Sequence, residues 1–262
     1  ATYKSVDHFA QHEVDYVTSI GGIEIVNDSR LGEQLSIDGL LEQHDAVFLG
    51  IGLGGVNALG VEGDGDEAVA SAVDFIADLR QADRFAKVPV GRRVLVIGGG
   101  MTAIDVATQA RLLGAQDVTI AYRRGRENMN ASHVEQNQSS SKGVNIRHWM
   151  MPVEVTKTGS GALEVKMEFT ELLAGKLKGT GKFQTIEVDQ LFTAIGQTLA
   201  SGDAIGSIAV EGGRISVDNE FRTSNPSVWA GGDCVAAGDD LTVTAVAQGR
   251  DAAESIHAAL SA

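Results

Sequence analysis

The stretch that decides the fold is Arg93-Val94-Leu95-Val96-Ile97-Gly98-Gly99-Gly100-Met101-Thr102-Ala103. Its first half is a run of large apolar residues, which is typical of a strand buried on both faces in a parallel sheet. Its second half has the spacing G-x-G-x-x-A, placed where a strand gives way to a helix. The helix is predicted to run to about Leu113, with Gly114 as its stop.

A second predicted strand, residues 118–122, completes a β-α-β unit of a parallel sheet. In such a unit Gly98 permits a sharp turn, Gly100 lets a pyrophosphate approach the backbone, and Ala103 allows the helix to pack closely on the strand. The start of the helix supplies free N–H groups and a positive dipole. The pattern predicts a dinucleotide site; the alternative is a glycine-rich turn that packs a helix and binds nothing.

The residues after the second strand indicate which dinucleotide would bind. A site for NAD usually has Asp or Glu there, about 20 residues after the glycines, to accept hydrogen bonds from the ribose. This sequence has Arg123 and Arg124, followed by Arg126. Guanidinium groups suit a 2′-phosphate, so the predicted cofactor is NADP(H). The alternative is a solvated basic turn whose arginines pair with nearby acidic residues.

The rest of the chain predicts an α/β fold with an antiparallel addition. Hydrophobic spacing and breaker residues predict helices at 5–20, 36–44, 67–83, 131–142 and 241–260. They predict strands at 46–49, 143–149, 153–157, 163–170, 183–188, 191–195, 215–217 and 227–230. Trp149, which follows one of these strands, is expected to lie in the core.

A second candidate site lies near the C-terminus. The predicted strand 227–230 ends in Gly231-Gly232-Asp233, and Leu241-Thr242-Val243 opens the last helix. A carboxylate beside a helix N-terminus suits a polyhydroxylated or phosphorylated ligand; a structural turn aspartate fits the residues equally well. Cys234 is expected to be a small buried residue rather than a redox nucleophile, since no partner cysteine exists.

Composition excludes several classes of protein. The chain has 262 residues, 32 of them Gly, one Cys and a formal net charge of −14. One cysteine excludes a disulfide framework, a CxxC redox pair and an iron–sulfur cluster held by this chain alone. The negative charge argues against binding to nucleic acid or anionic membranes. No apolar run approaches the roughly 20 residues of a membrane span, and a reducing, cytoplasmic setting is expected. No catalytic side chain and no metal site is predicted.

Several long motifs, taken in order, resemble the glutamate synthase small-subunit family, which includes the NAD(P)H-side subunit of dihydropyrimidine dehydrogenase. They are the segments 94–107, 122–132, 194–197, 230–235 and 242–250. The resemblance covers nearly the whole chain. It implies a pyridine-nucleotide domain inserted into an FAD domain, with hydride passing from NADPH to flavin. Electrons would then leave through iron–sulfur clusters to a larger catalytic partner.

The resemblance also implies domains and site residues. The domains would be residues 1–88 (rear part of the first half of the FAD domain), 89–200 (NADP domain) and 201–262 (C-terminal half of the FAD domain). Cofactor contacts would come from Gly98, Gly99, Gly100, Met101, Thr102, Ala103, Arg123, Arg124, Gly196, Gly232, Asp233, Leu241, Thr242 and Val243. Gly196 would mark a crossing between domains, and Asp233 would contact the FAD.

One departure from the family is large. Its first strand, which carries a G-x-G-x-x-G for the FAD pyrophosphate, should precede Tyr3 and is absent from this sequence, as is the cysteine-rich domain before it. We therefore expect this chain to be a fragment whose NADP domain is intact and whose FAD domain is incomplete. The glutamate synthase and dihydropyrimidine branches both remain open. A further alternative is a regulatory or assembly module that binds NADP(H) without turnover.

Overall fold

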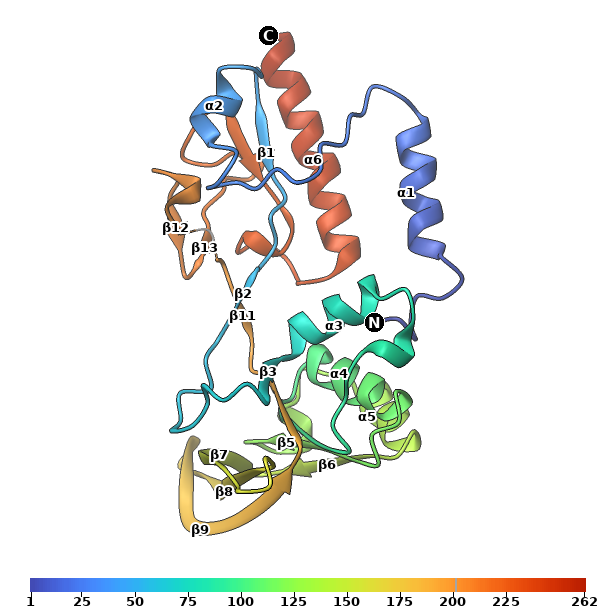
Figure 1. Cartoon of the computed structure of the whole chain (residues 1–262). Coiled ribbons are helices and arrows are strands. Elements are labelled where there is room, and N and C mark those ends of the chain that lie inside the picture. The colour runs from blue at the N-terminus through green and yellow to red at the C-terminus, as the bar shows by residue number, and fades with distance from the viewer. Residues whose placement is uncertain (201) are drawn as a thin grey trace. The chain divides into compact units, whose positions relative to one another are not determined.

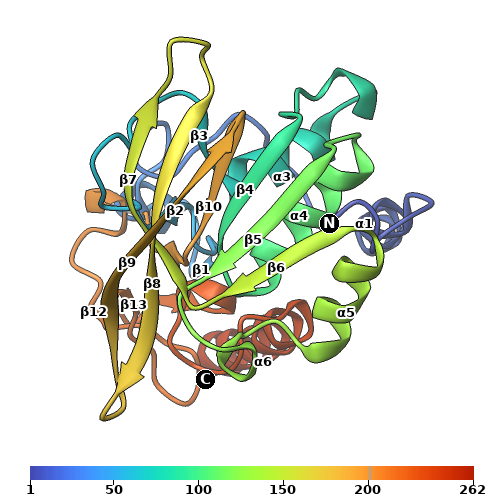
Figure 2. The same ribbon diagram turned by 90° about the horizontal axis from the view of Figure 1, so that it is seen from below.

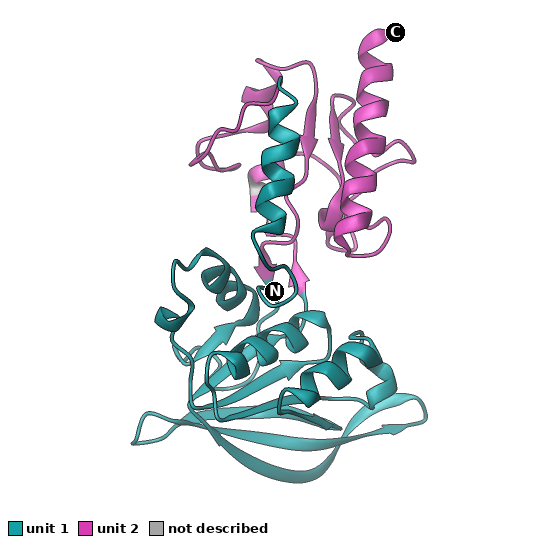
Figure 3. Cartoon of the chain, turned by 90° about the vertical axis from the view of Figure 1, so that its right-hand side faces the viewer, with its two compact units in different colours: residues 1–21, 56–196 teal, residues 22–55, 197–262 magenta. Residues whose placement is uncertain are grey.

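The computed structural model describes residues 1–200 and 202–262, which form two compact units. Unit 1 contains residues 1–21 and 56–196, and unit 2 contains residues 22–55 and 197–262 (Figures 1 and 3). Both units are therefore built from segments that lie far apart in the sequence.

Unit 1 is organised around a five-stranded parallel sheet in the order β3-β10-β4-β5-β6. Its strands are β3 (Val69–Ser71), β4 (Arg93–Gly98), β5 (Asp117–Tyr122), β6 (Val144–His148) and β10 (Gln190–Ala194). The helices are α1 (Phe9–Ser19), α3 (Ala72–Gln81), α4 (Met101–Leu112) and α5 (His133–Ser141), with 3₁₀ turns η1 (Phe85–Lys87) and η2 (Arg126–Asn128). A separate antiparallel sheet joins β7 (Met150–Lys157), β8 (Leu163–Leu173) and β9 (Lys176–Val188).

Alternate residues of β4 face two different cores. Val94 and Val96 pack with residues of α3 and α4, whereas Leu95 and Ile97 pack with the inner face of the antiparallel sheet. Figure 2 shows β10, β4, β5 and β6 side by side, with the antiparallel strands crossing them. The predicted strand at the centre of the unit is therefore buried on both faces, as its unbroken apolar run indicates.

Unit 2 is smaller. It contains α2 (Ile37–Leu41), β1 (Val47–Leu49), β12 (Val210–Glu211), β13 (Arg214–Ile215), β14 (Val228–Ala230), α6 (Thr242–Ser261) and the 3₁₀ turns η3 (Gly202–Ile205) and η4 (Gly232–Cys234). β1 and β14 pair in parallel, and β12 and β13 form an antiparallel pair. The short strand β2 (Gly55–Val56), whose two residues fall on either side of the unit boundary, pairs with β11 (Gln197–Thr198). Its core includes Ile37, Val47, Ile215 and Val228.

The predicted helix at 67–83 is wrong in its first part. Residues Val69–Ser71 form β3, which pairs in parallel with Leu191–Thr193 of β10, and the helix α3 begins only at Ala72. The side chain of Ser71 caps α3 by accepting hydrogen bonds from the N–H groups of Val73 and Asp74. A three-residue edge strand is too short to show a hydrophobic periodicity in the sequence, so it is recognised only by its pairing with the neighbouring strand.

The compact units differ in extent from the predicted domains. The boundary predicted between residues 88 and 89 falls inside unit 1, because β3 pairs with β10 and α3 packs beside α4. The rings of Phe75 in α3 and Phe192 in β10 lie 4.7 Å apart. The other boundary is predicted between residues 200 and 201, whereas the chain passes from unit 1 to unit 2 after Gly196. Ser201 itself lies outside the described residues. In the described part of the chain, no helix is long and apolar enough to span a membrane.

Candidate functional site

The predicted nucleotide residues of unit 1 meet at one edge of the parallel sheet. β4 ends at Gly98, its neighbour β5 ends at Tyr122, and its neighbour on the other side, β10, ends at Ala194. The glycine turn, the two arginines and Gly196 follow these ends and therefore lie at the carboxyl edge. The order of the strands reverses between β4 and β10, and ligands of open α/β sheets bind outside the carboxyl ends at such a point.

The three glycines of the turn serve different purposes. Gly98 has φ of 155°, and a Cβ there would overlap the carbonyl group of Ala194 in β10. A Cβ on Gly99 would overlap the ring of Tyr122. A Cβ on Gly100, by contrast, would meet no atom within 4 Å. The first two glycines are required by the packing of the protein itself, whereas the space over Gly100 fits the close approach of a phosphate group.

The start of α4 presents hydrogen-bond donors to this space. Gly100 is the N-cap residue of α4 and provides no side-chain cap. Within the described part of the chain, the N–H groups of Met101 and Thr102 make no hydrogen bond, whereas that of Ala103 donates to the carbonyl of Gly100. Met101 is 41% exposed, while Ala103 is fully buried and lets α4 approach the sheet. Free N–H groups and the helix dipole together favour an anion here.

Two unpaired arginines follow β5. Arg123 is exposed and Arg124 is partly buried. Within the described part of the chain, neither guanidinium group forms a hydrogen bond or an ion pair. Arg126 differs, because its Nε donates to Gln136 Oε1 over 3.2 Å and its Nη2 donates to Asn137 Oδ1. Among the described residues, no acidic side chain pairs with Arg123 or Arg124, so the alternative of a basic turn paired with acidic residues does not apply to them.

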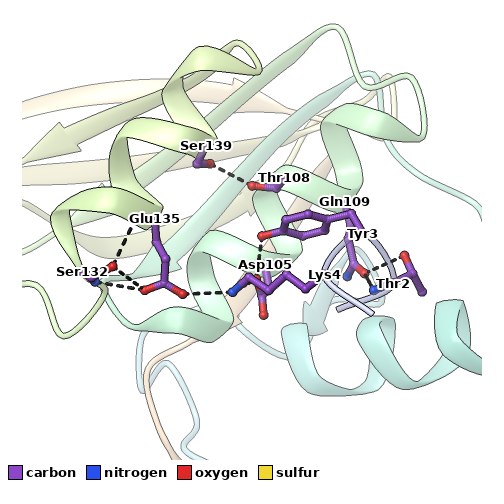
Figure 4. A network of polar contacts seen from close by, with 9 residues as sticks. All are labelled: Thr2, Tyr3, Lys4, Asp105, Thr108, Gln109, Ser132, Glu135 and Ser139. Carbon is purple, nitrogen blue, oxygen red and sulfur yellow. Dashed lines mark hydrogen bonds and ion pairs between the residues drawn. The ribbon is translucent and has the colours of Figure 1, made fainter. Parts of the chain in front are cut away.

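Residues near the start of the chain connect α4 to α5 (Figure 4). Lys4 Nζ lies 2.8 Å from Asp105 Oδ1 and 3.0 Å from Glu135 Oε1. Tyr3 Oη donates to Asp105 Oδ1 over 2.7 Å. Glu135 and Ser132 form a capping box at the start of α5. The ion pairs therefore join the second turn of α4 to the first turn of α5.

The same network shifts the pKa values of its members. Burial, together with the hydrogen bond to Asp105, raises the pKa of Tyr3 to about 12. Burial alone would lower the pKa of Lys4 and raise that of Glu135. The contacts of Lys4 with both carboxylates outweigh burial, so the pKa of Lys4 is raised and that of Glu135 is lowered. Lys4 and Glu135 are therefore both charged at neutral pH.

Gly196 lies two residues beyond β10, at the last position of unit 1. It is exposed, has φ of 108°, and its carbonyl accepts a hydrogen bond of 3.1 Å from the N–H of Asn57. The positive φ explains why glycine occupies this position. The structure places Gly196 at the same sheet edge as the glycine turn.

In unit 2, the Gly231-Gly232-Asp233 turn is braced by two residues whose role the sequence did not predict. Gln248 in α6 accepts a hydrogen bond of 2.6 Å from the N–H of Gly232 and donates one of 2.7 Å to the carbonyl of Ala237. Arg214 donates to the carbonyl of Asp233 over 2.8 Å. A single glutamine in an alanine-rich helix was the available signal for Gln248; nothing in the sequence marked Arg214.

Unit 2 also leaves polar groups free beside this turn. The carboxylate of Asp233 makes no hydrogen bond with a described residue, because Arg214 pairs with Asp240 and contacts only the Asp233 carbonyl. η4 packs against α6, whose N-cap residue Leu241 provides no side-chain cap. Thr242 is exposed, and Val243 is 74% exposed. The start of α6 thus combines free donors with an apolar surface.

Cys234 is a structural residue, as predicted. It is fully buried, and its Sγ lies 3.3 Å from the carbonyl oxygen of Leu49 and 3.2 Å from that of Gly231. Burial raises the pKa of its thiol, so little thiolate forms at neutral pH.

The fold and the edge of unit 1 define a dinucleotide-binding α/β protein. The chain belongs to the pyridine nucleotide-disulphide oxidoreductase family, whose model matches residues 4–249. Proteins of this family bind FAD and NADPH, the two cofactors that the sequence predicts. With one cysteine, the chain cannot form the intramolecular disulfide that the family name mentions.

Characterised relatives confirm the resemblance seen in the motifs. The chain is 35% identical over 258 residues to the small chain of glutamate synthase [NADPH] from Escherichia coli, covering 90% of this chain and 54% of the relative. It is 32% identical over 237 residues to the NAD-dependent dihydropyrimidine dehydrogenase subunit PreT of the same organism, covering 90% and 52%. The chain therefore spans about half the length of these relatives.

Solved structures support the fold. FprA from Mycobacterium tuberculosis in complex with NADPH matches with a TM-score of 0.72 and 18% identity, over 88% of this chain and 67% of that chain. Thioredoxin reductase from T. acidophilum matches with a TM-score of 0.66 and 20% identity, over 83% and 66%. The predicted α/β class, with Rossmann-like units, is thus confirmed.

Proposed function

We propose that this chain is the NADPH-side part of a flavoprotein oxidoreductase, which feeds electrons to a larger complex of the glutamate synthase or dihydropyrimidine dehydrogenase type. Unit 1 binds NADPH and unit 2 contributes to binding FAD. The observation that carries the proposal is the pair of unpaired guanidinium groups, Arg123 and Arg124, beside the open glycine turn.

The residues of unit 1 would share the binding of NADPH. The N–H groups at the start of α4, from Gly100 to Thr102, would bind the pyrophosphate, with Gly98, Gly99 and Ala103 shaping the turn. Arg123 and Arg124 would bind the 2′-phosphate through charge-assisted hydrogen bonds. Gly196 would border the nucleotide at the end of the neighbouring strand. None of these roles requires a side-chain acid or base.

The residues of unit 2 would bind part of the FAD. Asp233 would accept hydrogen bonds from the hydroxyl groups of the ribityl chain, and Leu241–Val243 would present donors and apolar surface to the flavin. When bound, FAD supplies a group that accepts hydride from NADPH. Both relatives described above carry subunit or chain names, which supports a larger partner. We propose that this partner receives the electrons through iron–sulfur clusters, in the cytoplasm.

The decisive test is titration of NADPH and NADH against the wild-type chain and the Arg123→Ala and Arg124→Ala variants. Each variant is expected to weaken NADPH binding at least tenfold and to change NADH binding less than about twofold, because only NADPH carries the 2′-phosphate. Arg126→Ala is the matched control, since Arg126 is already bound to Gln136 and Asn137. Equal weakening of both nucleotides would contradict the NADP assignment.

A second measurement separates an enzyme from a binding module. If unit 2 binds FAD, the chain reconstituted with FAD should be yellow, and its flavin absorption should bleach on adding NADPH. A chain that binds NADPH and retains no FAD would instead support a nucleotide-binding module without turnover of its own. The second outcome is compatible with this structure, because the whole parallel sheet and its carboxyl edge lie within unit 1.

A further inference from the structure

The backbone after β5 is held by residues of the antiparallel sheet. We use the name arginine loop for residues 123–125. Thr170 in β8 donates from Oγ1 to the carbonyl of Arg123 over 2.8 Å. The N–H of Trp149 donates to the carbonyl of Arg124 over 3.2 Å, and the N–H of Thr170 donates to the carbonyl of Trp149 over 2.9 Å. Two hydrogen bonds thus connect the arginine loop to β8 and to the turn between β6 and β7, and the third connects β8 to that turn.

An irregularity in β8 directs Thr170 toward the arginine loop. In β8 the side chains of Leu163, Val165 and Met167 are buried, as strict alternation requires. The register with β9 then shifts between Glu168 and Thr170, and Thr170 becomes the next buried residue, with 5% exposure. Without this β-bulge, alternation would turn the side chain of residue 170 to the opposite face.

The bulge is itself closed by specific contacts. Thr180 donates from Oγ1 to the carbonyl of Phe169 over 2.9 Å, and the N–H of Gly181 donates to Glu168 Oε1 over 2.9 Å. The change of register is therefore stabilised by specific hydrogen bonds. As a result, the hydroxyl group of Thr170 reaches the backbone of the arginine loop.

Trp149 adds a second unusual feature. Its φ is 59°, a left-handed conformation that is uncommon for a bulky residue, and its side chain is only partly buried rather than in the core as predicted. In this conformation its N–H reaches Arg124 while its carbonyl reaches Thr170. Backbone strain of this kind persists where surrounding contacts hold it, and here both polar groups of the residue are bound.

We infer that Thr170 is a positioning residue that sets the preference of the site for a 2′-phosphorylated nucleotide. The inference rests on the proposed binding of NADPH. The guanidinium groups of Arg123 and Arg124 have no hydrogen-bonded side-chain partner in the described chain, so their reach depends on where the backbone that carries them is held. The hydrogen bonds to the carbonyl groups of Arg123 and Arg124 reduce the number of backbone conformations of the loop. Less conformational entropy is then lost when the 2′-phosphate binds, so binding is stronger.

The test compares dissociation constants for NADPH and NADH, by calorimetry, in the wild type and three variants. Thr170→Val removes the hydroxyl group at nearly constant volume, Thr170→Ser keeps it, and Thr158→Val is the matched control. Thr158 also donates from its hydroxyl group to a backbone carbonyl, that of Ala162, but in the turn between β7 and β8. Melting temperatures are measured on the same samples.

We expect Thr170→Val to reduce the NADPH-over-NADH preference about tenfold, with NADH binding changed less than about twofold. Thr170→Ser and Thr158→Val should keep the preference of the wild type within about twofold. A folded Thr170→Val variant with an unchanged preference, or one that weakens both nucleotides equally, would overturn the inference. If Thr170→Val does not fold, Thr170→Ala provides the same comparison. A wild-type chain without preference for NADPH would contradict the proposed function instead.

Discussion

Gly98 and Ala194 face each other across the paired strands β4 and β10 so closely that no Cβ fits on Gly98. The contact lies at the strand ends that border the proposed nucleotide site. Gly98 is therefore required for the packing of the protein, whereas Gly100 of the same motif leaves room for the ligand.

The two requirements predict opposite phenotypes for two alanine substitutions. Gly98→Ala should lower the free energy of unfolding by more than about 2 kcal/mol, because its φ of 155° and the Ala194 carbonyl both oppose a side chain. Gly100→Ala should change stability by less than about 0.5 kcal/mol, because its surroundings are open. Gly100→Ala should nevertheless weaken NADPH binding at least tenfold. Denaturant unfolding and nucleotide titration of both variants check this, and a stable Gly98→Ala variant would contradict it.

Lys4 should stabilise unit 1 through its pairs with Asp105 and Glu135. Lys4→Met keeps most of the side-chain packing and removes both ion pairs, so we expect a loss of about 1 kcal/mol, measured by thermal unfolding at low salt. Lys4→Arg should retain most of the stability. A double-mutant cycle with Asp105→Asn isolates the pair, and a coupling energy near zero would show that the pair contributes nothing.

Gln248 should stabilise the Gly232 turn. Gln248→Leu preserves volume but leaves the N–H of Gly232 and the carbonyl of Ala237 without their partner, at a cost of about 1–3 kcal/mol. Gln248→Glu retains an acceptor for Gly232 but no donor for Ala237, and we expect an intermediate loss. Thermal unfolding of the three chains provides the comparison. Equal melting temperatures for all three would mean that the bridge does not hold the turn.

His148, the last residue of β6, should make unit 1 less stable in mild acid. Burial, assisted by the positive charge of Arg126, lowers the pKa of His148, and its Nε2 has no hydrogen-bond partner in the described chain. The unfolded state therefore binds a proton at a higher pH than the folded state, so stability falls as pH drops below about 6.5. The fall in melting temperature between pH 7.5 and 5.5 should be smaller in His148→Gln. An equal fall in both chains would assign the effect to other groups.

Local patterns were sufficient to predict the β4-α4-β5 unit. An unbroken apolar run, a glycine motif and a stop glycine all lie within about 25 residues, and each has a direct physical meaning. The edge strand β3 was missed because its three residues depend on pairing with β10, more than 100 positions away. Arg214 was missed for the same reason, since its acceptor Asp233 is selected by the tertiary fold. The sequence likewise could not show that Arg123 and Arg124 lack partners among the described residues, because that requires the coordinates of every side chain that could pair with them.

The pairing of β1 with β14 has a consequence for synthesis of the chain. In the described part of the chain, residues 47–49 pair with residues 228–230, whereas the sheet of unit 1 is complete once residue 194 has been made. At roughly 5–20 residues per second, β14 is made on the order of 10–40 s after β1. Val47 and Leu49, which are buried in the folded unit, lack this partner strand during that interval. All five strands of the unit 1 sheet are therefore available to pair before the partner strand of β1 has been made.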